Sequence, residues 1–355
     1  MTKLENRDRI LYSDILRTFT IYAVLIIHIC GVRWYSTIGT SEWYVLNTFM
    51  TMLRWCIPVF FMLSGVIILD PKYDLTLKKL YTKTLPRLVV ALIFWAVLYR
   101  TLSPITSLIR NIKEVTIDDW KRIYMEIIFD IPWHHLWFMY AIISIYILAP
   151  LIRVITANAE KKHYFYFLIL YFVFGSVIPK INAAYNVHIS FGIYELYSYT
   201  GYFIAGYFFS KYDLTTIQKK ILYTAGVFTF VWMLFWSTYI AATENSLSTH
   251  YFENIGPLTM IAAFFVFVLA KNFINNSTKI QKFKNNKYIT LLASCSLGIY
   301  LAHDLFNVLL NLLNINTGTF PAILSAPILA LFVYLASLCL ILIIKKIPIL
   351  KKWIV

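Results

Sequence analysis

The segment Ile15–Cys30 reads ILRTFTIYAVLIIHIC, an apolar run in which Arg17 and His28 are the only ionisable side chains other than the terminal thiol and Tyr22. Eleven helical steps of about 100° separate Arg17 from His28, which is within about 20° of three full turns. The two side chains therefore share one helix face, about 16 Å apart along the axis. Charged and titratable residues are costly inside an apolar span and usually mark a functional site.

The whole chain has the composition of a membrane protein. Of its 355 residues, 60% are hydrophobic and 14% are charged, and the mean hydropathy is +0.68. A soluble domain is about one quarter charged. We therefore predict an all-α polytopic membrane protein, with one integral-membrane domain over residues 1–355, no appended soluble domain and a first span that is retained rather than cleaved.

Ten apolar segments approach the length of about 20 residues that a membrane span requires. The sequence predicts them at Leu11–Gly31, Val45–Leu69, Pro86–Leu102, Leu136–Ile155, Tyr164–Ile178, Leu196–Ser210, Ile221–Ala241, Pro257–Phe273, Tyr288–Leu312 and Phe320–Ile344. The fifth and the sixth are short.

The lysine and arginine side chains gather in the two tails and in alternate connections between these spans. The positive-inside rule then predicts that both termini are cytoplasmic. This distribution explains the net charge of +15 by attraction to anionic lipids rather than to nucleic acid. The four cysteines form no CxxC pair, so the sequence indicates neither a disulfide framework nor a cysteine zinc site.

Arg54 is the charge with no cheap structural explanation, because it lies about nine residues into the second span, within Arg54–Gly65, RWCIPVFFMLSG. Pro58 has no N–H to donate to the carbonyl of Arg54, which predicts a kink there. Asp14 can pair with Arg17, and snorkelling of Arg17 to the cytoplasm is the structural alternative to a functional role.

Four further residues are candidates to line a substrate pocket. His135 and Trp137 follow His134 at the outer mouth of the fourth span, where an aromatic interfacial belt is the alternative. His303 lies within the ninth span, and Glu195 lies at the outer end of the sixth. Adjacent histidines do not share a helix face, and no carboxylate follows them at helical spacing, so no metal site is predicted.

The outer connection before these histidines contains a predicted interfacial helix over Asp118–Phe129, with Asp118 as its cap. After the second span, Lys79, Lys83 and Arg87 repeat every four residues and line one face if this segment is helical. Lys83 and Arg87 are candidates for phosphate binding, with the positive-inside signal as the alternative. No Walker A or HExxH motif is present, which disfavours ATP-driven transport by this chain.

Together these motifs resemble those of the membrane acyltransferase 3 family, over nearly the whole chain. Arg17 and His28 match its Arg-x10-His signature, and RWCIPVFFMLSG is similar to its second-helix block. The family's later blocks are matched by KTLPRL, HLWFMYAIISIYILAPLI and SLGIYLAHDL. Lys83 stands where an arginine is common, which weakens the case for two-pronged phosphate contact there. The likeness is strongest to stand-alone sugar O-acetyltransferases.

The resemblance implies ten helices in a bacterial cell membrane and transfer of an acyl group from acyl-CoA, usually acetyl-CoA, to a hydroxyl. The acceptor would be a cell-surface polysaccharide or its lipid-linked sugar precursor, and no cofactor would be bound permanently. His28 would act as general base, with Arg54 at the oxyanion. Direct transfer and a covalent acyl-histidine both stay open, as do the acyl group, the acceptor and the oligomeric state. The alternatives are a non-enzymatic exporter or flippase of a lipid-linked glycan and, third, a membrane-embedded sensor domain.

Overall fold

The computed structural model describes residues 9–109, 116–121, 125, 131–187, 189, 192–193, 196, 198–244, 246–247, 249 and 252–354. Every regular element among them is helical, which confirms the all-α prediction. The helices are α1 (Leu11–Trp34), α2 (Ser41–Met52), α3 (Cys56–Ile68), α4 (Leu77–Lys79), α5 (Leu85–Ile109), α7 (Trp137–Asn158), α8 (Lys161–Phe172), α9 (Ile178–Tyr185), α10 (Thr200–Lys211), α11 (Thr216–Glu244), α12 (Pro257–Asn276), α13 (Thr278–Gln281), α14 (Lys287–Leu312), α15 (Ala322–Ile344) and α16 (Pro348–Trp353). Two π-helical segments, η1 (Leu80–Thr84) and η2 (Val173–Val177), join α4 to α5 and α8 to α9.

Nine helical stretches of the described chain are long and apolar enough to cross a membrane, against the ten predicted. The difference is the sixth, because α10 has 12 residues and is only about 18 Å long. The hydrocarbon core is about 30 Å thick. A short helix at membrane depth is tolerated where protein surrounds it, and every residue of α10 from Gly201 to Phe209 is buried.

The chain divides into two compact units, which we describe separately. The first comprises Met1–Tyr73, Ile155–Ser296 and Asn316–Leu331, and the second comprises Asp74–Val154, Leu297–Ile315 and Phe332–Val355. Both are built from segments that are far apart in the sequence, so neither is a contiguous domain. The prediction of one integral-membrane domain remains a prediction.

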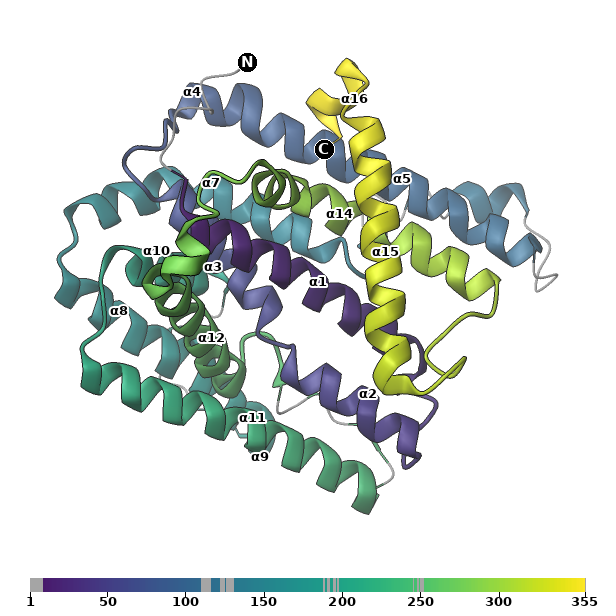
Figure 1. The fold of residues 1–355 in the computed structure, drawn as a ribbon, viewed down its shortest axis with the longest axis horizontal. Coiled ribbons are helices and arrows are strands. Elements are labelled where there is room, and N and C mark those ends of the chain that lie inside the picture. The colour runs from purple at the N-terminus through teal and green to yellow at the C-terminus, as the bar shows by residue number, and fades with distance from the viewer. Residues whose placement is uncertain are drawn as a thin grey trace. The chain divides into compact units, whose positions relative to one another are not determined.

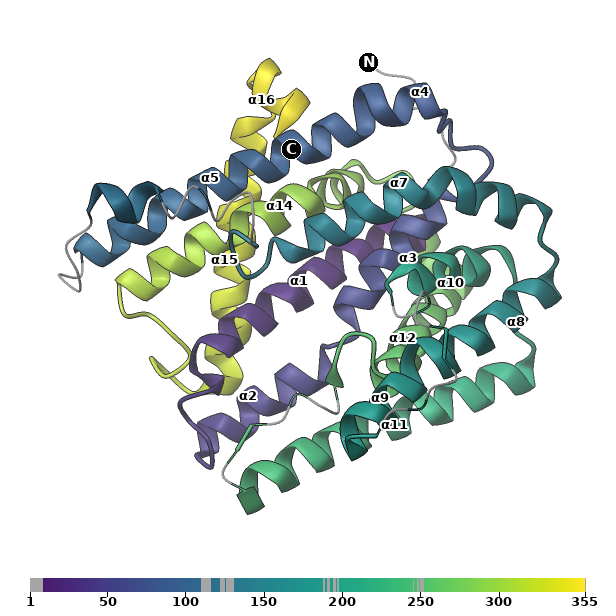
Figure 2. The ribbon, with the colours of Figure 1, turned by 180° about the vertical axis from the view of Figure 1, so that it is seen from behind.

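In the first unit, α3 lies directly against α10, as Figures 1 and 2 both show. Two glycines make this close approach possible. A Cβ on Gly65 would collide with the backbone carbonyl of Phe203, and one on Gly206 would collide with that of Met62. The backbones therefore touch at two points, an arrangement that small residues allow between membrane helices. This contact fixes α3 on a buried helix.

The same unit holds α10 at its C-terminal end through a buried cation. Lys271 of α12 donates from Nζ to the carbonyls of Phe209 (2.7 Å) and Ser210 (3.3 Å) and pairs with Asp213 Oδ1 at 2.9 Å. The last carbonyls of a helix have no intrahelical partners, so this side chain caps α10. The hydrogen bond and positive charge of Lys271 hold the pKa of the exposed Asp213 carboxyl below its usual value.

In the second unit, α5 carries aromatic side chains that tie it to two other helices. Trp95 Nε1 donates to the carbonyl of Ile354, which follows α16, at 3.4 Å. Tyr99 Oη donates to the carbonyl of Leu301 in α14 at 2.6 Å. Trp95 and Tyr99 are both 1% exposed or less, so these bonds lie in the core of the unit.

The helix predicted over Asp118–Phe129 is present in its described part, but its predicted cap is wrong. Residues 117–121 are helical, and the remainder of the prediction, except Met125, lies outside the described residues. Thr116 is the cap, because its Oγ1 accepts from the N–H of Asp119 while the Asp119 carboxylate accepts from that of Thr116. Asp118 lies inside the helix and pairs with Lys121 instead.

Candidate functional site

The helix that carries Arg17 and His28 is continuous from Leu11 to Trp34. The shared face predicted from the spacing of these two residues therefore follows from the observed helix geometry. Both side chains are partly exposed, whereas Ile21, Leu25 and other residues of α1 are fully buried. Arg17 donates from Nη2 to the carbonyl of Leu63 in α3 at 3.5 Å, a long bond that anchors it only weakly.

The second span is interrupted at Arg54. Helix α2 ends at Met52 and α3 begins at Cys56, so residues 53–55 form a turn in the middle of a membrane-crossing segment (Figure 1). Pro58 contributes to the break because it cannot donate to the carbonyl four residues before it. The kink predicted from Pro58 is therefore observed, as a complete break. Interrupted helices in membrane proteins place polar backbone groups where they line binding sites.

The guanidinium of Arg54 has unusually little compensation. Its Nε is buried and has no hydrogen-bond partner within the part of the chain that the structure describes. No carboxylate of that part forms an ion pair with it, and its one aromatic contact is with the ring of Phe252, 4.8 Å from the guanidinium carbon to the ring centroid. A buried cation in this state is poised to bind an anion. The N-terminus of α3, which begins two residues later, adds its positive dipole end.

Contacts between α1 and the α2–α3 segment bring His28 level with this break. The two run antiparallel in the first unit, since Trp34 Nε1 donates to Asn47 Oδ1 at 3.3 Å while Arg17 contacts the carbonyl of Leu63. Interpolating between these contacts and the Arg33 ion pair with Glu42 places His28 level with about residue 50, in the last turn of α2 before the break. An imidazole and a poorly compensated guanidinium thus occupy the same level of one unit.

The basic residues that precede α5 lie in the second unit. The chain is helical without interruption from Leu77 to Ile109, through η1, so the helix on which the shared face of Lys79, Lys83 and Arg87 depends is present. Lys83 and Arg87 are exposed. Lys79 pairs with Asp74 at 3.3 Å. Binding of phosphate groups by Lys83 and Arg87 stays a prediction.

His135 and His303 come together in the second unit, although 168 positions separate them in the sequence. Their ring centroids are 4.7 Å apart, and both side chains are buried. Tyr300 Oη donates to the carbonyl of His135, and His303 Nδ1 lies 2.6 Å from the carbonyl of Tyr300. Trp137 is the first residue of α7 and is half-buried. Glu195 lies outside the described residues.

The sequence reasoning missed Trp133 as a site residue and did not consider Asp304. Asp304 is 4% exposed, and its two carboxylate oxygens accept from Trp133 Nε1 and from Asn307 Nδ2. An acidic residue within an apolar helix is the same signal that singled out Arg17. It could have been found in the block SLGIYLAHDL, directly after His303.

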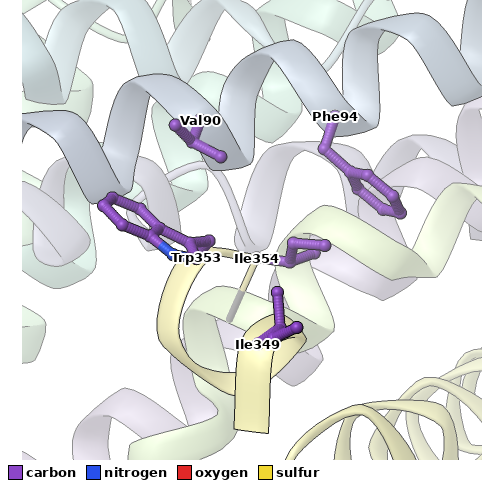
Figure 3. Close-up of a pocket in the computed structure, with 5 residues that line it drawn as sticks. All are labelled: Val90, Phe94, Ile349, Trp353 and Ile354. Atoms are coloured by element: carbon purple, nitrogen blue, oxygen red, sulfur yellow. The ribbon is translucent and has the colours of Figure 1, made fainter. Parts of the chain in front are cut away.

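A depression between α5 and α16 carries no candidate chemistry. Figure 3 shows its lining, which is apolar throughout: Val90, Phe94, Ile349, Trp353 and Ile354. None of the predicted site residues borders it. We therefore base the candidate site on the side chains above rather than on this depression.

One comparison with known proteins identifies the family of the chain. Residues 10–346 match the family model described as Acyltransferase domain. The match extends from the start of α1 to just beyond α15 and includes all the candidate residues. No curated protein and no solved structure matches the chain. Coverage of nearly the whole length by one family model establishes that the chain belongs to the acyltransferase 3 family and is a membrane acyltransferase.

Proposed function

We propose that this protein transfers an acyl group, acetyl in the first instance, from acyl-CoA to a hydroxyl of a cell-surface glycan or its lipid-linked precursor. The observation that carries the proposal is the antiparallel run of α1 along the α2–α3 segment in the first unit, from which we infer that His28 lies near the level of the helix break at Arg54. Acyl transfer needs a base for the attacking hydroxyl and a positive group for the oxyanion that forms. These two side chains supply both.

In the proposed reaction, a ring nitrogen of His28 accepts the proton of the acceptor hydroxyl as its oxygen attacks the thioester carbonyl. The carbonyl oxygen becomes an oxyanion, and Arg54 stabilises it by charge and by its N–H groups. The tetrahedral intermediate then collapses, the C–S bond breaks, and the sulfur of CoA leaves with the proton held by His28. The products are the acyl ester and free CoA.

Arg54 suits this role because its charge is not neutralised before substrate arrives. A guanidinium already paired with a carboxylate would have to lose that partner first, whereas a preorganised cation costs no reorganisation at the moment of reaction. The positive end of α3 acts in the same direction. The same features would also let Arg54 orient the polarised thioester carbonyl of the donor.

The donor carries several phosphate groups, and the chain offers cations for them. In the first unit we assign this role to Arg17, which shares one face of α1 with His28. In the second unit Lys83 and Arg87, exposed on the helix that contains η1, are separate candidates for phosphate binding. On this proposal Arg17→Lys impairs transfer, because an ammonium cannot reproduce two-pronged contact with phosphate. This proposal places the protein in a bacterial cell membrane with both termini on the cytoplasmic side. That is the side on which acyl-CoA is available.

The test is transfer of label from acetyl-CoA to lipid-linked sugars by the full chain in proteoliposomes. His28→Ala should abolish transfer while expression and thermal unfolding stay unchanged. His163→Ala is the matched control, because His163 is an exposed histidine in the cap of α8 and should leave the rate unchanged. Full transfer by His28→Ala would refute the assignment of the base. Movement of glycan without any label, across a broad acceptor panel, would identify an exporter instead.

A further inference from the structure

A second group of ionisable residues, in the second unit, has no part in the proposed reaction. His134 and His135 lie in the turn before α7, and Asp304 lies in α14. One ligand atom from each of the three lies within 4.8 Å of the other two. His134 Nδ1 and Asp304 Oδ2 are 3.8 Å apart.

This arrangement removes both reasons for discounting a metal at the histidine pair. The argument from helix faces does not apply, because His134 and His135 precede the first residue of α7 and lie in a turn. The missing carboxylate does not come from the same helix but from Asp304, 170 positions later in the chain. Sequence spacing could not indicate this ligand.

The electrostatics of the site call for a cation. Asp304 is a carboxylate with 4% of its surface exposed, and no lysine or arginine among the described residues pairs with it. Its neighbours are three imidazoles, those of His134, His135 and His303, and two neutral donors. Burying a carboxylate without a full positive charge beside it is costly. A divalent ion would supply that charge.

The surroundings also have the form of a second ligand shell. Ligating carboxylates in metal sites are themselves hydrogen-bonded, and both oxygens of Asp304 accept bonds, from Trp133 Nε1 and Asn307 Nδ2. The ring of Tyr99 stacks on Trp133 with centroids 5.2 Å apart and meets the ring of His135 edge-on at 5.1 Å. These contacts hold a ligand and its supporting donor in place.

We infer that His134, His135 and Asp304 form a binding site for a divalent transition-metal ion, for which Zn²⁺ is the best fit. Two imidazoles and one carboxylate are a typical zinc ligand set, and three protein ligands leave the fourth position open to water or substrate. Zinc holds neighbouring ligand atoms about 3.3 Å apart. Binding of the ion would therefore draw the ligand atoms of the three side chains closer together by about an ångström. The ion joins the turn before α7 to α14.

The test is metal binding by the purified full chain in lipid nanodiscs, with no activity measurement needed. After removal of metal by a chelator, titration with Zn²⁺ should give one ion per chain and raise the temperature of unfolding. Co²⁺ in its place should give the visible absorption bands of a tetrahedral site. His134→Ala should weaken Zn²⁺ binding more than about tenfold, and because its side chain is 57% exposed the variant should fold normally.

Asp304→Asn should weaken binding similarly, and Asn307→Ala should weaken it about tenfold by freeing the carboxylate. His163→Ala is the control for loss of any histidine and should bind as the wild type does. Absence of Zn²⁺ binding by the folded wild-type chain would overturn the inference. So would unchanged affinity and unchanged Co²⁺ bands in folded His134→Ala.

Discussion

Replacing Arg54 by methionine should strongly slow acyl transfer and, at the same time, make the protein more stable. Removing an arginine that stabilises the fold lowers the free energy of unfolding. Removing an arginine that serves the reaction raises it, because the charge of such a residue stays poorly compensated until substrate binds. The two roles thus predict opposite signs for the change in stability.

The size of the effect follows from the contacts of Arg54. A buried unpaired N–H costs about 1–3 kcal/mol, and a cation–π contact such as the one with Phe252 contributes about 0.5–2 kcal/mol. Removing both should raise the free energy of unfolding by about 1 kcal/mol. Loss of the oxyanion contact should lower the rate constant of transfer by about 10²–10³-fold.

Arg33→Met is the matched control, from the same unit. Arg33 holds Glu42 with two bonds of 2.8 and 2.9 Å, and Glu42 also accepts from Thr317. In this variant the free energy of unfolding should fall by about 1 kcal/mol, because the ion pair is partly exposed. The transfer activity should be unchanged. Thermal unfolding and label transfer, measured on the same purified samples, give both quantities. The reasoning would be refuted if Arg54→Met unfolded at a lower temperature than the wild type and transferred label at the normal rate.

Three further predictions concern the helices around α10. Lys271→Met leaves the last carbonyls of α10 unpaired and should lower the free energy of unfolding by about 1–3 kcal/mol, as seen in thermal or denaturant unfolding. Because the pKa of Asp213 is lowered in the fold, its contribution is present above about pH 4 and is lost as the pH falls through its folded pKa. Stability measured against pH should therefore drop less in acid for Asp213→Asn. Gly206→Ala forces a methyl group into the backbone of Met62 and should cost about 1–3 kcal/mol. Gly31→Ala is the control, because a methyl group at Gly31 meets open space and should be neutral or stabilising. Equal unfolding temperatures for Gly206→Ala and Gly31→Ala would contradict the close contact between α3 and α10.

The sequence was sufficient wherever a local pattern determines the structure. The 3.6-residue period placed Arg17 and His28 on one face, and α1 is helical throughout. Pro58 indicated the discontinuity after α2 because the missing N–H is a covalent property of the residue. Hydropathy identified nine of the spans, and failed for α10 because a helix enclosed by other helices can be short.

What the sequence could not provide was contact between distant segments. His135 and Asp304 meet because α7 and α14 pack in one unit, and no spacing rule connects positions so far apart. The predicted cap of the helix at residues 117–121 is wrong for a smaller reason, since Thr116 and Asp118 are both good N-cap residues and only the backbone decides between them. The poor compensation of the Arg54 charge likewise depends on the positions of side chains that are distant in the sequence.

The π-helical segment η1 lets the helix before α5 lose one residue without turning its basic face. A π turn holds one more residue than an α turn, so deleting any one residue of Leu80–Thr84 would restore a regular α-helix. A π turn and the α turn that replaces it rotate the chain by nearly the same total angle, so Lys79 and the residues before it would keep their orientation relative to α5. The apolar stripe of α5 would also keep its place. A change of one residue in the length of this turn would therefore leave both the basic face and the membrane-embedded part of the helix untouched.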